Sequence, residues 1–99
     1  MLSEILEANP ADAFARYGLA MEYAGQQKYE AALAEFARLV ELNPDYVPGF
    51  HMYAQTLLRA GRSDEARAML RRGIDCAGRM KNAHAQGEMT ELLGEIEQA

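Results

Sequence analysis

Apolar residues recur every three or four positions along most of this chain, which is the spacing of one face of an α-helix. Such stripes predict helices over about 12–24, 28–42, 45–60, 63–77 and 82–97, with a shorter helical turn within residues 1–9. No segment alternates apolar and polar residues with a period of two, so the sequence predicts no strand. The expected fold class is therefore all-α.

Turn-forming residues separate these segments. Gly25–Gln27 and Gly61 follow the ends of two stripes, where glycine commonly terminates a helix. Pro44 cannot continue a helix and closes the stripe before it. Asp45 and Ser63 are the residue types that cap a helix N-terminus, and we expect them to cap the two helices that follow.

A repeat emerges when the chain is shifted by 34 residues. Asn9–Pro10 then falls on Asn43–Pro44, whereas Arg16 falls on Phe50, a poor match. One helix pair cannot bury its own apolar face, so two such pairs must stack. Small residues would lie where the helices of a pair approach closely, and larger ones would fill the space between pairs. The matching positions are Ala20 with Ala54, Tyr23 with Leu57, Ala32 with Ala66, and Phe36 with Leu70.

The period, the helix–turn–helix units and the closing proline resemble the tetratricopeptide repeat (TPR) over roughly residues 9–78. The first copy matches the family pattern at Leu19, Ala20, Tyr23, Ala32, Phe36 and Pro44. The second copy matches it at Phe50, Ala54, Gly61, Ala66, Leu70 and Gly73. The departures are Arg16 for a large apolar residue, Gln27 for the turn glycine, Leu39 for a small residue and Gly78 for the proline.

The resemblance implies a TPR-like superhelix of stacked antiparallel helix pairs in a single domain. Residues 1–9 would form an N-terminal helical turn, 10–44 the first repeat and 45–78 the second. Residues 79–99 would form a C-terminal capping helix, whose apolar stripe covers the last repeat.

In TPR proteins the first helices of successive repeats line a concave groove that holds a peptide. The resemblance implies that the groove residues here are Phe14, Tyr17, Met21, Ala24, His51, Gln55 and Leu58. The family's carboxylate clamp has Lys and Asn on this face, which are absent at these positions, so binding of a chaperone tail is not expected. An apolar, Met-containing surface suits a helix or an extended apolar segment. Whether the C-terminal helix covers this surface instead is left open by the sequence.

Composition narrows the class of protein further. The 99 residues carry a net charge of −5 and one cysteine. This charge disfavours nonspecific binding to nucleic acid or an anionic membrane, and a single cysteine excludes an internal disulfide. The first residues lack the pattern of a signal peptide, so we expect a cytoplasmic protein.

The side chains that could act in catalysis or bind a metal are more simply interpreted as structural or solvated. Cys76 lies among apolar residues near a helix end and is expected to be a buried structural thiol. His84, Glu88, Glu91 and Glu95 share one side of the last helix, but no facing ligand completes a metal site, so we interpret them as a solvated acidic face. We expect no enzymatic activity, no cofactor and no bound metal.

Charge is distributed unevenly along the chain. Residues 1–49 carry −5, residues 50–82 carry +4, and residues 83–99 carry −4. Arg67, Arg71 and Arg72 lie on one side of their helix and could pair with nearby acids, with an acidic partner or with a second copy. The function expected is a protein–protein interaction scaffold that binds a peptide or helix of unknown identity. The alternative is a homodimeric assembly unit whose groove is covered by the C-terminal helix.

Overall fold

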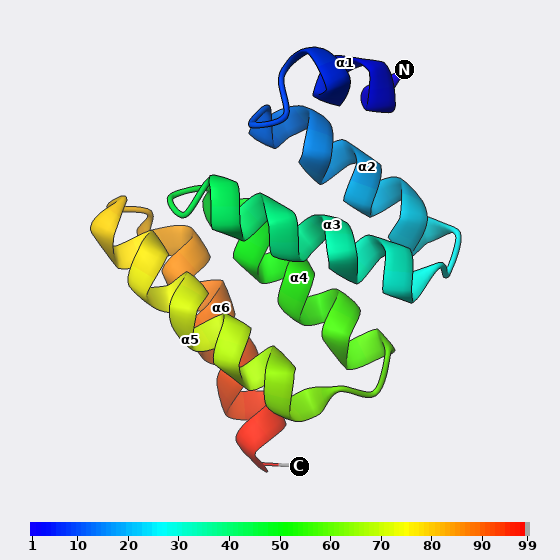
Figure 1. The fold of residues 1–99 in the computed structure, drawn as a ribbon. Helices are drawn as coiled ribbons and strands as arrows, with labels where there is room; N and C mark the ends of the chain where they lie inside the picture. Colours follow the sequence, from blue (N-terminus) through cyan, green and yellow to red (C-terminus); the bar gives the residue numbers. More distant parts are fainter. Residues whose placement is uncertain (99) are drawn as a thin grey trace.

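The computed structural model describes residues 1–98, so residue 99, the end of the expected domain, lies outside the described part. The described residues form six α-helices and no strand, which confirms the all-α fold class (Figure 1). The helices are α1 (Leu2–Ala8), α2 (Ala13–Gly25), α3 (Tyr29–Leu42), α4 (Val47–Arg59), α5 (Ser63–Arg79) and α6 (Ala83–Gln98).

The helices stack in chain order as antiparallel neighbours (Figure 1). α2 pairs with α3 and α4 pairs with α5, while α1 packs on α2 and α6 packs on α5. The stack measures 42 × 30 × 17 Å. None of the helices within residues 1–98 is both long and apolar enough to cross a lipid bilayer.

Small residues occupy the close contacts within each helix pair. The four alanines that recur at the 34-residue spacing are all 0% exposed: Ala20, Ala32, Ala54 and Ala66. Of the large residues of the same pattern, Phe36 and Leu70 are fully buried, Leu57 is 1% exposed, and Tyr23 is only half-buried. The pattern in the sequence therefore identified the buried contacts of both hairpins.

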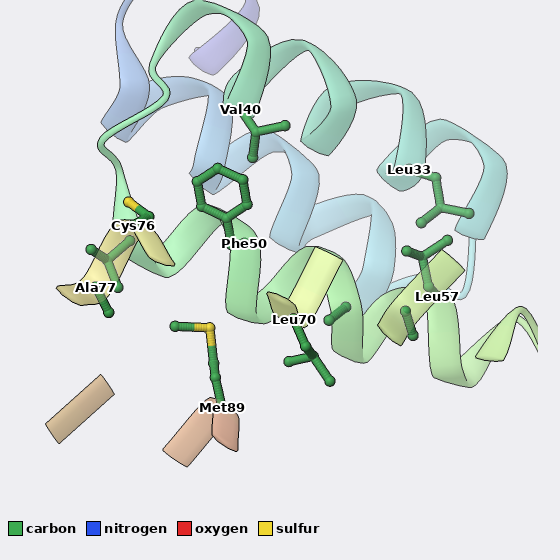
Figure 2. Packing of buried hydrophobic residues seen from close by; sticks show 11 residues of the cluster. Leu33, Val40, Phe50, Leu57, Leu70, Cys76, Ala77 and Met89 are labelled. Carbon is green, nitrogen blue, oxygen red and sulfur yellow. The ribbon is translucent and has the colours of Figure 1, made fainter. Parts of the chain in front are cut away.

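The larger core cluster joins the second hairpin to the helices on either side of it. Figure 2 shows the Phe50 ring beneath Val40 of α3, and the Met89 side chain extending from α6 toward Phe50. Met89 is 0% exposed and belongs to the same cluster as Leu70 of α5. The C-terminal helix is thus part of the core rather than an appendage.

Glycines permit the closest helix approaches, and one of them explains a departure from the repeat pattern. A Cβ atom at Gly73 would lie 2.8 Å from Cβ of Phe50 and 2.5 Å from Sδ of Met89. In the first repeat the equivalent of Gly73 is the bulky Leu39. Its side chain packs against Gly49 of α4, where a Cβ would lie 2.9 Å from the Leu39 methyl group. In this contact the small residue is therefore Gly49 of α4, and the bulky residue is on α3.

A second departure, Arg16, is accommodated by an ion pair. Its guanidinium donates to Oε1 of Glu35 at 2.6 Å, and the two side chains are only 12% and 24% exposed. Arg16 also donates to the carbonyl oxygen of Pro10 at 3.0 Å, while its Nε is buried with no partner among the described residues. A charged contact between α2 and α3 therefore replaces the apolar one expected at this position.

The turns confirm some expectations and correct others. Gln27 and Gly61 both adopt a positive φ, +61° and +77°, so glutamine occupies the left-handed turn position of the first repeat. The predicted caps Asp45 and Ser63 are wrong. The N-cap residues are Tyr46 and Arg62, and neither makes a side-chain capping bond. The carboxylate of Asp45 instead pairs with Arg79 at 3.2 Å, and Ser63 is the first residue of α5.

The missing proline at Gly78 lengthens α5. α3 ends at Leu42, which corresponds to Cys76 after the 34-residue shift, yet α5 continues to Arg79. The turn then closes with Lys81 at a φ of +58°, and the Asn82 carboxamide oxygen accepts from the backbone N–H of Ala85 at 3.1 Å. The shift in register delays the start of α6 by two residues relative to α2 and α4.

Candidate functional site

The seven residues expected to line a groove lie on the first helices of the two hairpins, α2 and α4. We call this surface the groove face. Its α2 part consists of Phe14, Tyr17, Met21 and Ala24, and its α4 part of His51, Gln55 and Leu58. The described residues of α6 that border it are Glu88, Glu91, Leu92 and Glu95.

The α2 part of the groove face is aromatic and only partly covered. Phe14 is 78% exposed, and the half-buried Tyr17 and Met21 follow it at helical spacing, so the three form an apolar strip and not a single scattered residue. Tyr17 is half-buried and packs edge-on against Phe36 and Tyr46, with ring centroids 6.4 and 5.7 Å apart. Met21 is also half-buried, whereas Ala24 is 4% exposed and belongs to the floor beneath them.

A shallow cavity of about 360 Å³ adjoins this aromatic end, and sequence reasoning missed it. It lies between the start of α2 and the turn that joins α3 to α4. Nδ2 of Asn43 is buried beside it without a hydrogen-bond partner in the described chain. The repeated Asn–Pro dipeptide marked this turn but gave no sign of a cavity. Its lining residues are Ala13, Leu42, Asn43, Pro44, Asp45 and Tyr46.

Burial shapes the ionisation of this end. Burial, followed by the neighbouring Tyr46, raises the pKa of Tyr17 above the usual tyrosine value of 10.0. Burial alone raises the pKa of Tyr46. Both phenols are therefore neutral at physiological pH, and the α2 part of the groove face carries no charge.

The α4 part of the groove face is polar. Nε2 of His51 and Nε2 of Gln55 lie 3.0 Å apart, so the imidazole accepts from the Gln55 amide in the tautomer that leaves Nε2 unprotonated. These two residues line one side of a cavity of about 250 Å³. The other side is formed by α6 with Glu88, Glu91, Leu92 and Glu95.

Leu58, the last expected groove residue, lines a separate and larger cavity of about 490 Å³ beside the turn between α4 and α5. Ile96 shares its apolar surface, and Glu95 and Arg67 supply charge. Arg67 is paired with Asp64 of its own helix. This cavity depends on the position of α6, which spacing in the sequence alone does not determine.

The remaining candidate side chains have structural roles. Cys76 is 0% exposed, its thiol donates to the carbonyl oxygen of Pro44 at 3.4 Å, and burial raises its pKa, so the expected buried thiol is confirmed. Arg71 pairs with Glu97 at 2.8 Å, and the Arg72 guanidinium lies 5.3 Å from the centre of the Phe50 ring. Within residues 1–98 no group of three or more His, Cys, Asp or Glu side chains is placed to hold a metal ion.

Comparisons with known proteins agree on the family. The tetratricopeptide repeat model matches residues 23–87. The solution structure of a tetratricopeptide repeat domain protein from Salinibacter ruber superposes with a TM-score of 0.85 at 31% identity, covering 91% of each chain. No curated protein sequence matches the chain significantly.

Two more distant structures share the fold. The type III secretion translocator chaperone SycD of Yersinia enterocolitica superposes with a TM-score of 0.88 at 14% identity, over 98% of this chain and 68% of its own. A protein of Bordetella parapertussis gives 0.82 at 21% identity, over 98% and 84%. The family match spans more than half of the chain, from the last residues of α2 through α3, α4 and α5 to the first residues of α6. The chain therefore belongs to the tetratricopeptide repeat family.

Proposed function

We propose that this protein is a non-catalytic interaction scaffold that binds a peptide or helix of a partner protein along the groove face. Tetratricopeptide repeats serve generally as protein-interaction scaffolds, which supports the broad part of this proposal. We also propose that residues 10–44 and 45–78 are its two repeats, flanked by an N-terminal helical turn within residues 1–9 and a capping segment over 79–99.

The observation that carries the proposal is the exposure of Phe14. A phenylalanine left 78% exposed costs hydrophobic stabilisation, which a bound apolar side chain would recover. Tyr17 and Met21 continue the apolar surface inward from it. The thioether of Met21 adapts to different side chains at little cost, so the surface suits a segment that inserts one or two apolar residues.

The same exposure favours an open groove over the alternative in which α6 covers it. α6 packs chiefly on α5 and reaches the groove face only along α4. Phe14, Tyr17 and Met21 lie on α2, one hairpin away from α6. A partner segment would therefore meet the aromatic end directly and find α6 as one wall of the far end.

The test begins with a library of random short peptides selected for binding to the immobilised protein. Affinity of the selected peptides is then measured for Phe14→Ala and for Met80→Ala. Met80 is 50% exposed at the end of α5, so its variant controls for the loss of an exposed apolar side chain off the groove face. We expect Phe14→Ala to weaken binding at least about tenfold, equivalent to about 1.4 kcal/mol, with Met80→Ala unchanged. Equal affinities for both variants would place the binding surface elsewhere.

A further inference from the structure

The groove face changes its chemical character along its length. At the α2 end the surface residues Phe14, Tyr17 and Met21 carry no charge at neutral pH. At the α6 end three carboxylates, Glu88, Glu91 and Glu95, line the cavity that faces α4. The groove is therefore apolar at one end and anionic at the other.

Nearby bases leave most of this negative charge uncompensated. His84 lies 3.5 Å from Glu88, but both side chains are largely exposed and the pair is ionic only when the imidazole is protonated. Across the cavity α4 offers His51, whose Nε2 is already engaged with Gln55. Neither Glu91 nor Glu95 makes an ion pair with a described residue, and residues 83–99 contain no Lys or Arg.

The arginines of α4 and α5 do not pair with Glu91 or Glu95. Arg67 of α5 borders the neighbouring cavity but pairs with Asp64. Arg71 pairs with Glu97 on a different side of α6. Arg59 is the final residue of α4, four positions beyond Gln55, and is exposed. No Lys or Arg is among the residues that line the α4–α6 cavity.

We propose, building on the proposed function, that the groove binds an amphipathic peptide segment of defined orientation. Its apolar or aromatic residues contact Phe14 and Met21, and its Lys or Arg side chains enter the α4–α6 cavity beside Glu91 and Glu95. Charge complementarity selects this occupant, because a lysine or arginine gains a carboxylate partner there while an acidic residue meets like charge. Leu92, a half-buried residue that also lines the cavity, provides an apolar contact for the methylene stem of the same side chain.

A second copy of this chain fits the groove less well. The segment nearest the aromatic end, residues 1–49, carries −5, and the segment that contains α6 carries −4. Contact between either of these regions and a groove lined by glutamates brings like charges together. The net positive charge of a second copy lies in residues 50–82, where Arg62, Arg67, Arg71 and Arg79 already pair within the chain.

The test compares charge variants of the groove with a matched control. Peptides selected from the random library are titrated against the wild-type protein, Glu91→Gln/Glu95→Gln and Glu7→Gln/Glu22→Gln. The control removes the same two charges from exposed positions on α1 and on another side of α2. We expect selected peptides to carry Lys or Arg next to apolar residues. Their affinity should fall about three- to tenfold for the α6 double variant, the size expected of two exposed ion pairs, and be unchanged for the control.

Salt and self-association provide the opposing outcomes. Raising NaCl from about 0.05 M to about 0.5 M should weaken peptide binding to the wild type. At the higher salt concentration the wild type and the α6 double variant should bind the peptides with equal affinity. Selected peptides without basic residues, or equal affinity for the two double variants, would overturn the charge proposal and leave the scaffold proposal intact. A free protein that elutes as a dimer and is dissociated by Glu91→Gln/Glu95→Gln would assign the carboxylates to a second copy, which also overturns it. Failure of Phe14→Ala to affect any peptide would instead overturn the scaffold proposal.

Discussion

Replacing Gly73 with alanine sets two opposing effects against each other. Gly73 lies in the middle of α5, where glycine is a poor helix former. Alanine there should stabilise the helix by about 1 kcal/mol if the added methyl group had room. The structure shows that it does not, since α4 and α6 both approach α5 at this residue.

The magnitude follows from which neighbour can move. The new Cβ would lie 2.5 Å from Sδ of Met89 and 2.8 Å from Cβ of Phe50. The Met89 side chain is flexible and can rotate away, although it is fully buried. Cβ of Phe50 is fixed to the α4 backbone, so relief requires α4 and α5 to move apart. Overpacking of this kind costs about 2–3 kcal/mol, which leaves a net loss of about 1–2 kcal/mol after the helix gain.

The assay is urea denaturation followed by far-UV circular dichroism, with the transition midpoint and slope compared between variants. Gly87→Ala is the matched control. Gly87 also lies within a helix, α6, but a Cβ there would meet nothing within 4 Å. We expect the midpoint to fall for Gly73→Ala and to rise for Gly87→Ala by the equivalent of about 0.5–1 kcal/mol.

Opposite signs for the same chemical change would show that packing at Gly73 outweighs helix propensity. If both variants gained stability, the close contact of α4, α5 and α6 would be looser than described, and α6 would not be fixed by Met89 against the second hairpin. The inference about the α4–α6 cavity would then lose its structural basis.

Three other perturbations test separate parts of the structure. Glu35→Gln should lower the free energy of unfolding by about 1–3 kcal/mol, because it leaves the largely buried Arg16 guanidinium without its charged partner. The double variant Arg16→Leu/Glu35→Leu should have a free energy of unfolding within about 1 kcal/mol of the wild type, or above it, in urea melts. Burial raises the pKa of Tyr17 above the ordinary tyrosine value of 10.0, so this tyrosine ionises first in the unfolded chain. The free energy of unfolding that Tyr17 contributes should therefore be complete below pH 10.0 and decrease as the pH rises above it. Tyr17→Phe should reduce that fall in melting temperature, and an unchanged profile would contradict the assignment. Light scattering should show that the wild type is a monomer, and Leu92→Glu/Ile96→Glu should lower its free energy of unfolding. A dimeric wild type that this double variant converts into a folded monomer would show instead that α6 forms a dimer interface.

The buried contacts could be predicted from sequence because the repeat encodes them twice. Ala20 and Ala54 occur at the same position of the two copies, so each copy gives independent support for a small residue at that contact. The caps had no such check. Asp45 and Ser63 have the right chemistry for an N-cap, but the preceding turns place Tyr46 and Arg62 there. Local propensity was overridden by the geometry of stacking.

Departures from the family pattern became interpretable only with neighbours in three dimensions. Leu39 is bulky where a small residue is expected, and the compensating Gly49 lies on another helix. Arg16 is charged where an apolar residue is expected, and its partner Glu35 lies on α3. Such pairs are distant in the sequence, and a single chain offers no pattern that links them.

The candidate site shows the same division. Helical spacing placed Phe14 and His51 on the first helices of the two hairpins, as the structure has them. It could not indicate that Glu91 of α6 faces His51 across a cavity, because the register of α6 depends on the three extra residues of α5. The acidic face, interpreted from sequence as solvated, is exposed in the structure and also lines the cavity between α4 and α6.

The central claim is that a partner segment lies along the groove face. It is tested most directly by ¹H–¹⁵N chemical-shift mapping of the protein titrated with a library-selected peptide. The account predicts that the perturbed amides fall on α2 near Phe14 to Met21, on α4 near His51 to Gln55, and on α6 near Glu88 to Glu95. The chemical shifts of amides on α3 near Arg38 and on α5 near Arg72 should change little. Perturbations concentrated on α3 and α5, with α2 and α6 unaffected, would contradict the account.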